Sequence, residues 1–276
     1  RCIIVFDGKG GSTRRRKLFP GYKGNRVNRT SFNRFNEFAD ITDEQSSMRI
    51  QMQRLVEYLM LLPVSILSID YIEADDAIAY ISRQLVTKRS TIVSTDKDFL
   101  QLVNETTEVW NPTRKLLFTP EKIKEDYLII PENMLLFRTF DGDGSDCIPG
   151  VKGIGIKTLI KHFPDIVNVE ISQEELLAKA RVIKEQAKKN KKVIKAIETI
   201  ITSEPQLDLN YKLMQLEDVD ISASIKSSIR SAFERTPDKL NKFQFRKMFV
   251  EDRLHLIIKN FDPWLSNSFG FLNNHT

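Results

Sequence analysis

Acidic residues end three short apolar runs of this chain. In chain order the runs and their acids are Ile3 to Phe6 with Asp7, Val64 to Ile72 with Glu73, and Thr91 to Thr95 with Asp96. Two segments with helical spacing of apolar residues, 48–62 and 75–86, separate these β-rich runs. Strands that alternate with helices predict an α/β domain with a mostly parallel central sheet. The acids are then expected at the carboxyl edge of that sheet, where α/β proteins bind their ligands.

Further carboxylates surround two of these strand ends and a later loop. The three acid groups are Glu73-Ala-Asp-Asp76, Ser94-Thr-Asp-Lys-Asp98, and Asp141, Asp143 and Asp146 in a glycine-rich stretch. Carboxylates crowded into a partly buried site repel one another unless a cation is present. Capping of a helix N-terminus is the alternative for the group at Glu73, because acids are favourable there. A divalent-metal site accounts for all the acid groups together.

The ligand types indicate which metal fits. Oxygen ligands without a histidine or cysteine cluster favour Mg²⁺ or Mn²⁺ over zinc, and the three histidines are scattered along the chain. The acids exceed the needs of one ion, and two ions about 4 Å apart suit in-line displacement at a phosphodiester. A calcium loop that starts at Asp141 is excluded, because its sixth position is Asp146 and its twelfth is Lys152.

A glycine-rich turn follows the acidic loop. It contains Gly150, Gly153, Gly155, Lys157, Thr158 and Lys161. A P-loop needs lysine directly after the second glycine, and a dinucleotide fingerprint needs a third glycine where Thr158 stands, so neither motif fits. A tight turn that opens a helix remains, and its backbone N–H groups and two lysines suit a phosphate of a nucleic-acid backbone. Simple helix packing is the alternative.

Basic residues concentrate in two blocks. Residues 1–36 carry ten Lys or Arg against one acid, and residues 179–195 carry eight against one. The blocks indicate a polyanionic partner, with solvated helix or loop faces as the alternative. No apolar run approaches the roughly 18 residues that span a bilayer, and two cysteines, Cys2 and Cys147, point to a reducing compartment. We therefore expect a soluble protein of the cytoplasm.

The second half of the chain is predicted to be largely helical. Helices are expected to start at Thr119-Pro120 and at Pro131-Glu132, where proline occupies the first turn. Residues 161–253 carry helical patterns. The tail Trp264 to Thr276 is polar, and its sequence pattern assigns it no structure.

Five motifs, in this order, resemble the signatures of the 5′-nuclease or flap endonuclease family, which includes phage 5′-exonucleases of the RNase H type and the nuclease domain of bacterial DNA polymerase I. The motifs are Tyr22-Lys-Gly-Asn-Arg26, Ile72-Glu-Ala-Asp-Asp76, Ser94-Thr-Asp-Lys-Asp98, Gly142-Asp-Gly-Ser-Asp146 and Gly150-Val-Lys-Gly-Ile-Gly-Ile-Lys-Thr158. The resemblance runs from Cys2 to about residue 163. It implies a PIN-like 5′-nuclease core with a helical arch and a helix–three-turn–helix region that binds DNA.

The resemblance also implies the residues of the site. The first metal would be surrounded by Asp7, Glu73, Asp75, Asp76 and Asp96, and the second by Asp98, Asp143 and Asp146. Lys23 and Arg26 would stabilise charge on the scissile phosphate. The expected DNA contacts are Arg14, Arg15, Arg16, Gly150, Gly153, Gly155, Lys157, Thr158 and Lys161. The implied cofactors are two Mg²⁺ or Mn²⁺ ions, with K⁺ at the glycine turn.

The arch is expected within residues 17–47, and a single 5′ strand would pass through or under it. Phe32, Phe35 and Phe38 could stack on bases there, but their spacing of three equally suits helix packing, which we favour. Family members begin with an earlier strand whose aspartate binds the first metal, and none precedes Arg1 here. Either an N-terminal piece is omitted from the sequence or one ligand is missing, and omission is the expectation.

The implied activity is metal-dependent 5′→3′ exonuclease and flap endonuclease cleavage of DNA in replication or repair, with RNA primers in RNA–DNA hybrids as further substrates. The alternatives are a catalytically impaired protein that binds junctions or flaps, and a PIN-type ribonuclease. A monomer is expected, with a sliding clamp or a single-strand-binding protein as candidate partners. The predicted regions are an α/β catalytic core that includes the arch at 1–135, the acidic loop and helix–three-turn–helix at 136–205, and a C-terminal helical region and tail at 206–276.

Overall fold

The computed structural model describes residues 1–26, 37–191 and 193–275, and two compact units divide the chain. The first unit comprises Arg1–Lys9, Asn28–Asp70 and Ala223–Thr276, and the second comprises Gly10–Val27 and Tyr71–Ser222. Each unit contains one small sheet. The predicted α/β class is confirmed, although the described strands form two separate sheets in place of one. No helix within the described ranges is both long and apolar enough to cross a bilayer.

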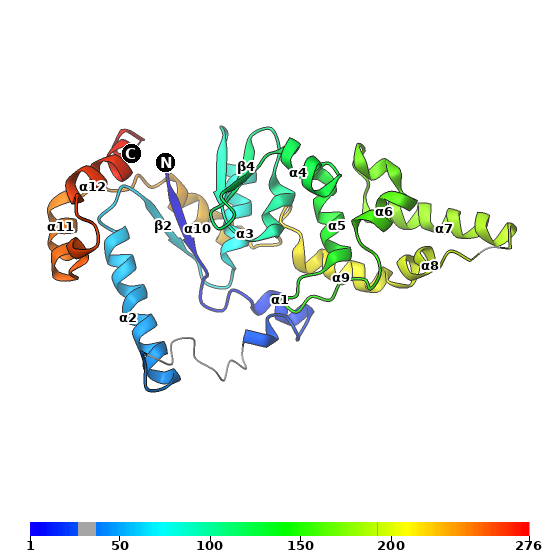
Figure 1. Cartoon of the computed structure of the whole chain (residues 1–276), viewed down its shortest axis with the longest axis horizontal. Helices are drawn as coiled ribbons and strands as arrows, with labels where there is room; N and C mark the ends of the chain where they lie inside the picture. The colour runs from blue at the N-terminus through cyan, green and yellow to red at the C-terminus, as the bar shows by residue number, and fades with distance from the viewer. Residues whose placement is uncertain (27–36, 192, 276) are drawn as a thin grey trace. The chain divides into compact units, whose positions relative to one another are not determined.

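The first unit is built on a β-α-β arrangement. Strand β1 (Ile3–Phe6) pairs in parallel with β2 (Ser65–Ser68), and helix α2 (Ile41–Leu59) lies between them in the chain (Figure 1). The side chain of Asp40 caps α2, because one of its oxygens accepts from the N–H groups of Thr42 at 2.7 Å and Asp43 at 2.9 Å. A parallel pair needs a crossover of this length, as the sequence predicts.

Three later helices complete this unit. They are α10 (Ala223–Glu234), α11 (Lys242–Glu251) and α12 (Phe261–Phe269). The buried core around Phe245, Phe249 and Leu265 also takes in aromatic rings of α12, and Phe249 and Phe261 lie 4.5 Å apart between ring centroids. The tail, to which the sequence pattern assigns no structure, is therefore helical from Trp264 to Phe269, and its apolar residues are packed in this core.

The second unit contains the sheet that carries most of the acids. Strand β3 (Ser90–Val93) pairs in parallel with β4 (Thr107–Asn111), which pairs antiparallel with β5 (Leu116–Phe118). The sequence analysis did not identify β4 or β5. The hairpin leaves β4 in the middle of the sheet, where Val109 is 1% exposed.

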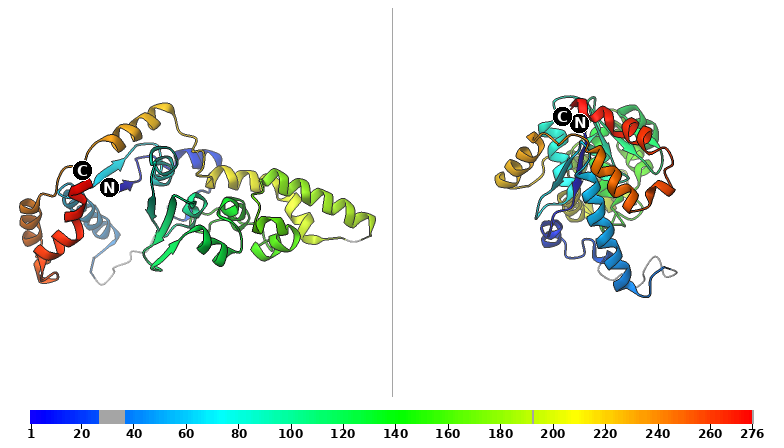
Figure 2. Two further views of the ribbon diagram at one scale, coloured as in Figure 1. Left: turned by 90° about the horizontal axis from the view of Figure 1, so that it is seen from above. Right: turned by 90° about the vertical axis from the view of Figure 1, so that its left-hand side faces the viewer.

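Helices surround this sheet and extend from it within the second unit (Figures 1 and 2). They are α1 (Thr13–Leu18), α3 (Ala74–Tyr80), α4 (Pro120–Tyr127), α5 (Met134–Asp141), α6 (Ile156–His162), α7 (Gln173–Lys189), α8 (Lys195–Thr202) and α9 (Glu204–Met214). Helix α5 packs on α9, and α7 lies beside α8. The helix starts predicted at Thr119 and Pro131 are confirmed, the second as a 3₁₀ turn that leads into α5. The largely helical stretch after residue 161 is confirmed as well.

Candidate metal centre

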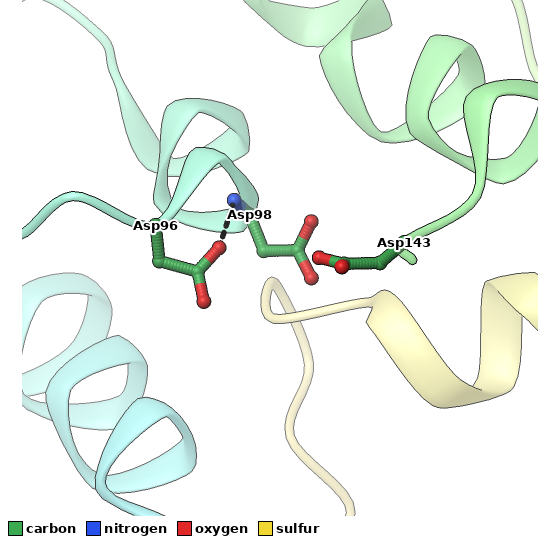
Figure 3. Close-up of side chains that lie close together, drawn as sticks. All are labelled: Asp96, Asp98 and Asp143. Atoms are coloured by element: carbon green, nitrogen blue, oxygen red, sulfur yellow. Dashed lines mark hydrogen bonds between the residues drawn. The ribbon is translucent and has the colours of Figure 1, made fainter. Parts of the chain in front are cut away.

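Three aspartates converge in the second unit. Asp96 follows β3 and Asp98 lies in the 3₁₀ turn behind it, while Asp143 comes from the loop after α5. Each offers a carboxylate oxygen, and these oxygens all lie within 4.8 Å of one another. Figure 3 shows the carboxylates of Asp98 and Asp143 facing one another, with Asp96 accepting the backbone N–H of Asp98 at 2.8 Å. The strand end and the later acidic loop therefore meet, as the sequence predicts.

Burial and neighbouring negative charge both raise the pKa of carboxylates in this cluster. Burial, followed by the negative charge of Asp96, raises the pKa of Asp75 to about 7. Burial also raises the pKa of Asp98 to about 6 although Arg138 opposes it. A carboxylate that retains its proton near neutral pH gains from a nearby cation. The carboxylate oxygens are suitable ligands for a divalent ion, and the cluster has too little positive charge of its own, so both features fit such an ion.

Glu73 and Asp76 are held by cations of the chain itself. The guanidinium of Arg15 donates to both oxygens of Asp76 at 2.8 and 2.9 Å and to Glu73 at 2.6 Å. Burial alone would raise the pKa of Glu73, but Arg15 and Lys23 hold it below its ordinary value. Glu73 also stands at the N-cap of α3, so the capping alternative applies to it.

Arg15 corrects one expectation of the sequence analysis. It is 3% exposed, and its Nε also donates to the carbonyl of Leu213 at 2.8 Å. With every donor group turned inward, Arg15 is an internal counter-charge in place of the predicted DNA contact. Arg14 is partly exposed and pairs with Asp76 at 3.3 Å, whereas Arg16 is exposed. The three arginines cannot be distinguished from the sequence, and they differ in the structure because Arg15 lies on the buried face of α1.

Lys23 lies among the acids. Its ammonium group pairs with Glu73 and lies 3.8 Å from a carboxylate oxygen of Asp146. Its backbone N–H donates to the carbonyl of Asp146 at 2.9 Å, and it adopts a positive φ of 53°. Lys23 is therefore brought into the acidic cluster. The side chain of Arg26, the other predicted cation, lies outside the described part of the chain, as do Phe32 and Phe35 of the expected arch.

Two glycines hold the loop that carries Asp143. A Cβ on Gly150 would lie 2.2 Å from the carbonyl oxygen of Asp141, and one on Gly142 would lie 2.4 Å from the nitrogen of Gly150. The backbones of Asp143 and Ile148 exchange two hydrogen bonds of 2.8 Å. Within this tight loop Asp143 accepts the N–H and hydroxyl of Ser145, both at 2.7 Å. The close approach thus fixes the direction of the Asp143 carboxylate.

Arg138 is a member of the centre that the sequence analysis missed. It is 3% exposed and donates to Asp98 at 2.8 Å, to Asp141 at 3.1 Å and to Asp143 at 3.0 Å. These contacts connect α5 to the acidic cluster. The one signal in the sequence was a single charged residue within the apolar stretch Met134 to Phe140.

The connected carboxylates outnumber the cations that pair with them. The acids are Glu73, Asp75, Asp76, Asp96, Asp98, Asp141, Asp143 and Asp146, and the cations are Arg14, Arg15, Lys23 and Arg138. Arg14 also lies 3.9 Å from the exposed carboxylate of Asp220, so negative charge predominates among the described residues of the cluster.

The remaining predicted site residues are Asp7 and those of the glycine turn. Asp7 follows β1 in the first unit, where its backbone carbonyl accepts the Ser68 hydroxyl at 3.3 Å. In the glycine turn, Gly153 has a positive φ of 81°, and Gly155 precedes α6. Lys157 and Lys161 are exposed on that short helix, and Thr158 is partly exposed. The expected turn that opens a helix is confirmed.

Solved structures with a similar fold bind metal ions. The 5′-exonuclease of bacteriophage T5 with divalent zinc ions superposes with a TM-score of 0.60 at 21% identity, over 90% of this chain and 82% of that chain. A further structure of the phage T5 protein, co-crystallised with metal ions, gives 0.61 at 23% identity and covers 90% and 84% of the two chains. The fold is therefore that of a 5′-nuclease.

Sequence relatives define the family. Residues 1–128 match the family model described as 5′-3′ exonuclease, N-terminal resolvase-like domain. A 5′-3′ exonuclease of Buchnera aphidicola subsp. Acyrthosiphon pisum is 34% identical over 239 residues, which is 83% of this chain and 73% of that protein. DNA polymerase I of Bacillus subtilis is 30% identical over 74% of this chain, but over only 22% of its own length. The chain belongs to the 5′-3′ exonuclease family.

Proposed function

We propose that this protein is a metal-dependent 5′→3′ exonuclease and flap endonuclease that hydrolyses phosphodiester bonds in DNA during replication or repair. The observation that carries the proposal is the convergence of Asp96, Asp98 and Asp143 in a fold shared with a metal-binding 5′-exonuclease. The surplus of negative charge in the cluster supports the same activity, because in-line displacement at phosphorus requires compensation of negative charge.

The two proposed ions are Mg²⁺ or Mn²⁺, since the ligands are hard oxygens. The residues that would hold them are Glu73, Asp75, Asp76 and Asp96 for the first ion, and Asp98, Asp143 and Asp146 for the second, all within the second unit. When bound, such ions lower the pKa of water and polarise the phosphoryl oxygens. Lys23, placed between Glu73 and Asp146, would offset charge that develops on the phosphate, with Arg26 as its partner.

The contacts proposed to bind DNA do not distinguish one base sequence from another, because they are made to the phosphate backbone. Backbone N–H groups of the turn at Gly153 and Gly155, with Lys157 and Lys161, would hold a duplex phosphate, and K⁺ would bind at the turn. Arg16 would add a further contact from α1. The lysines of α7 and α8 that lie exposed are Lys179, Lys184, Lys188, Lys189 and Lys195. This distribution supports a polyanionic partner.

Release of a fluorescent 5′ flap by the full-length protein in MgCl₂ tests the proposal. We expect Asp98→Ala and Asp143→Ala to abolish cleavage and to leave DNA binding nearly intact. Asp165→Ala is the matched control, because the exposed carboxylate of Asp165 pairs with Lys179 in the same unit, and this variant should cleave like the wild type. Binding without cleavage by the wild type would favour the impaired junction-binding alternative. Equal cleavage by all three variants would refute the site.

A PIN-type ribonuclease is separated from this function by the glycine turn. Substitution of Gly153, whose positive φ disfavours any side chain, should weaken duplex binding by a nuclease that grips DNA there. The same change should leave a compact ribonuclease unaffected. The comparison is the cleavage of a single-stranded RNA by the Gly153 variant and by the wild type.

A further inference from the structure

Arg138 is a buried cation that the proposed cleavage does not use. Its Nε donates to Oδ1 of Asp98 at 2.8 Å, its Nη2 to Oδ2 of Asp143 at 3.0 Å, and its Nη1 to Oδ2 of Asp141 at 3.1 Å. The side chain is 4% exposed, whereas that of Asp141 is 44% exposed. One guanidinium thus bridges the two carboxylates that face one another in Figure 3.

A charge at this position is costly. Apart from Arg138 and Thr139, helix α5 is apolar from Met134 to Phe140, and all of these residues are buried. Moving a guanidinium out of water is repaid only by close and well-oriented partners, and a hydrophobic residue often gives equal or greater stability. Packing alone therefore does not account for an arginine at position 138, and we look for the explanation in the carboxylates with which it pairs.

The partners of Arg138 are acids that repel one another in the folded protein. Oδ1 of Asp143 already accepts from Ser145, so Arg138 takes the other oxygen of this carboxylate. On Asp98 the guanidinium takes Oδ1. A divalent ion that binds Asp98 and Asp143 together would stand close to this fixed positive charge, and the two cations would repel one another.

We propose that Arg138 is a positioning residue that serves as the resident counter-ion of Asp98 and Asp143. It holds the two carboxylates face to face when no metal is bound, and its charge weakens their affinity for a divalent cation. This inference rests on the proposed function, since it assigns a regulator of affinity to the same site. Metal is then bound weakly enough to be exchanged, while the carboxylates keep their geometry.

Titration of the full-length protein with MnCl₂ alone, without DNA, tests the inference by calorimetry. Arg138→Met removes the charge and keeps much of the apolar volume, and we expect it to bind Mn²⁺ about tenfold more tightly or better. Arg138→Lys keeps the charge and should bind Mn²⁺ within about twofold of the wild type. Arg181→Met is a control, because Arg181 is an exposed arginine that pairs with Glu204 away from the acids.

Thermal unfolding gives the second readout. In EDTA, Arg138→Met should unfold at a lower temperature than the wild type, because three carboxylates lose their partner. In MnCl₂ the gap should close, and the metal-induced rise in Tm should exceed that of the wild type by about 3 °C or more. Arg138→Gln serves as a milder variant if the methionine variant does not fold in EDTA.

The outcomes separate this inference from the proposed function. A Tm that falls equally in EDTA and in MnCl₂, with Mn²⁺ affinity unchanged or weakened in both neutral variants, would show that Arg138 is only a structural anchor. A wild type that binds no Mn²⁺ and cleaves no flap would instead refute the proposed function. A wild type that binds and cleaves, with neutral variants of unchanged affinity, overturns the inference alone.

Discussion

Substitution of Gly150 by alanine tests how the acidic loop is held. An added Cβ would lie 2.2 Å from the carbonyl oxygen of Asp141, 2.7 Å from its carbonyl carbon and 2.8 Å from the carbonyl oxygen of Phe140. All three atoms belong to the backbone at the end of α5, so no side-chain rotation relieves the clash. The two backbone segments must move apart, and Asp143 lies on the loop between them.

The expected cost follows from this geometry. Overpacking in a well-packed region costs about 1–3 kcal/mol, and a clash with fixed backbone belongs at the upper end. About 3 kcal/mol corresponds to a fall in Tm of roughly 6–12 °C for a unit of this size. Displacement of Asp143 should also weaken Mn²⁺ binding by the folded variant.

Gly144→Ala is the matched control, because it lies in the same loop with nothing within 4 Å of its added Cβ. Thermal unfolding and a Mn²⁺ titration of both variants measure the effect. We expect Gly144→Ala to match the wild type within about 2 °C. If Gly150→Ala unfolded at the wild-type temperature with unchanged Mn²⁺ affinity, the close approach would not be what fixes the loop.

Three further predictions concern protons, phosphates and packing. Mn²⁺ must displace the protons of Asp75 and Asp98, whose pKa values are raised to about 7 and about 6, so affinity measured by calorimetry should fall as the pH decreases from 8 to 6. The metal-free folded state also binds more protons than the unfolded chain between about pH 4 and 7, so these two groups should make chemical denaturation easier as pH rises through that window. Lys157→Ala and Lys161→Ala should each reduce the salt slope of duplex binding by about 0.9 if each lysine contacts one phosphate, and an unchanged slope would exclude them. Phe249→Ala removes a ring that is 2% exposed and should cost about 3–5 kcal/mol in urea unfolding, with Phe243→Ala, 75% exposed, as the neutral control.

The strand-end acids could be predicted from the sequence because they depend on local order. An apolar run followed by an acid places that acid at the carboxyl end of a strand, and the positions of Asp96 and Asp98 after β3 follow from this rule. The meeting of Asp143 with them was anticipated from the chemistry of metal ligands. Strands β4 and β5 were missed because their residues carry no acid at the strand end and a short hairpin has little periodicity.

The roles of the arginines could not be predicted in the same way. Arg14, Arg15 and Arg16 are adjacent and identical in type, yet only Arg15 lies on the face of α1 that turns toward Glu73 and Asp76. Arg138, three residues before the end of α5, has the appearance of an ordinary cation near a helix C-terminus. Its partners become visible only when Asp98, forty residues earlier in the chain, is brought beside it.

The distribution of these arginines explains how an acidic centre can exist before metal arrives. A site built from carboxylates alone would depend on cations in order to fold, because their repulsion would be unopposed. Here Arg15 pairs with one group of acids and Arg138 with the other, so α1 and α5 each bring a fixed cation into the centre. Within the described residues Asp75 and Asp96 form no ion pair with a guanidinium, and the pKa of Asp75 is raised to about 7. The uncompensated charge is therefore concentrated between the two arginine-paired groups, which is where divalent cations would gain most.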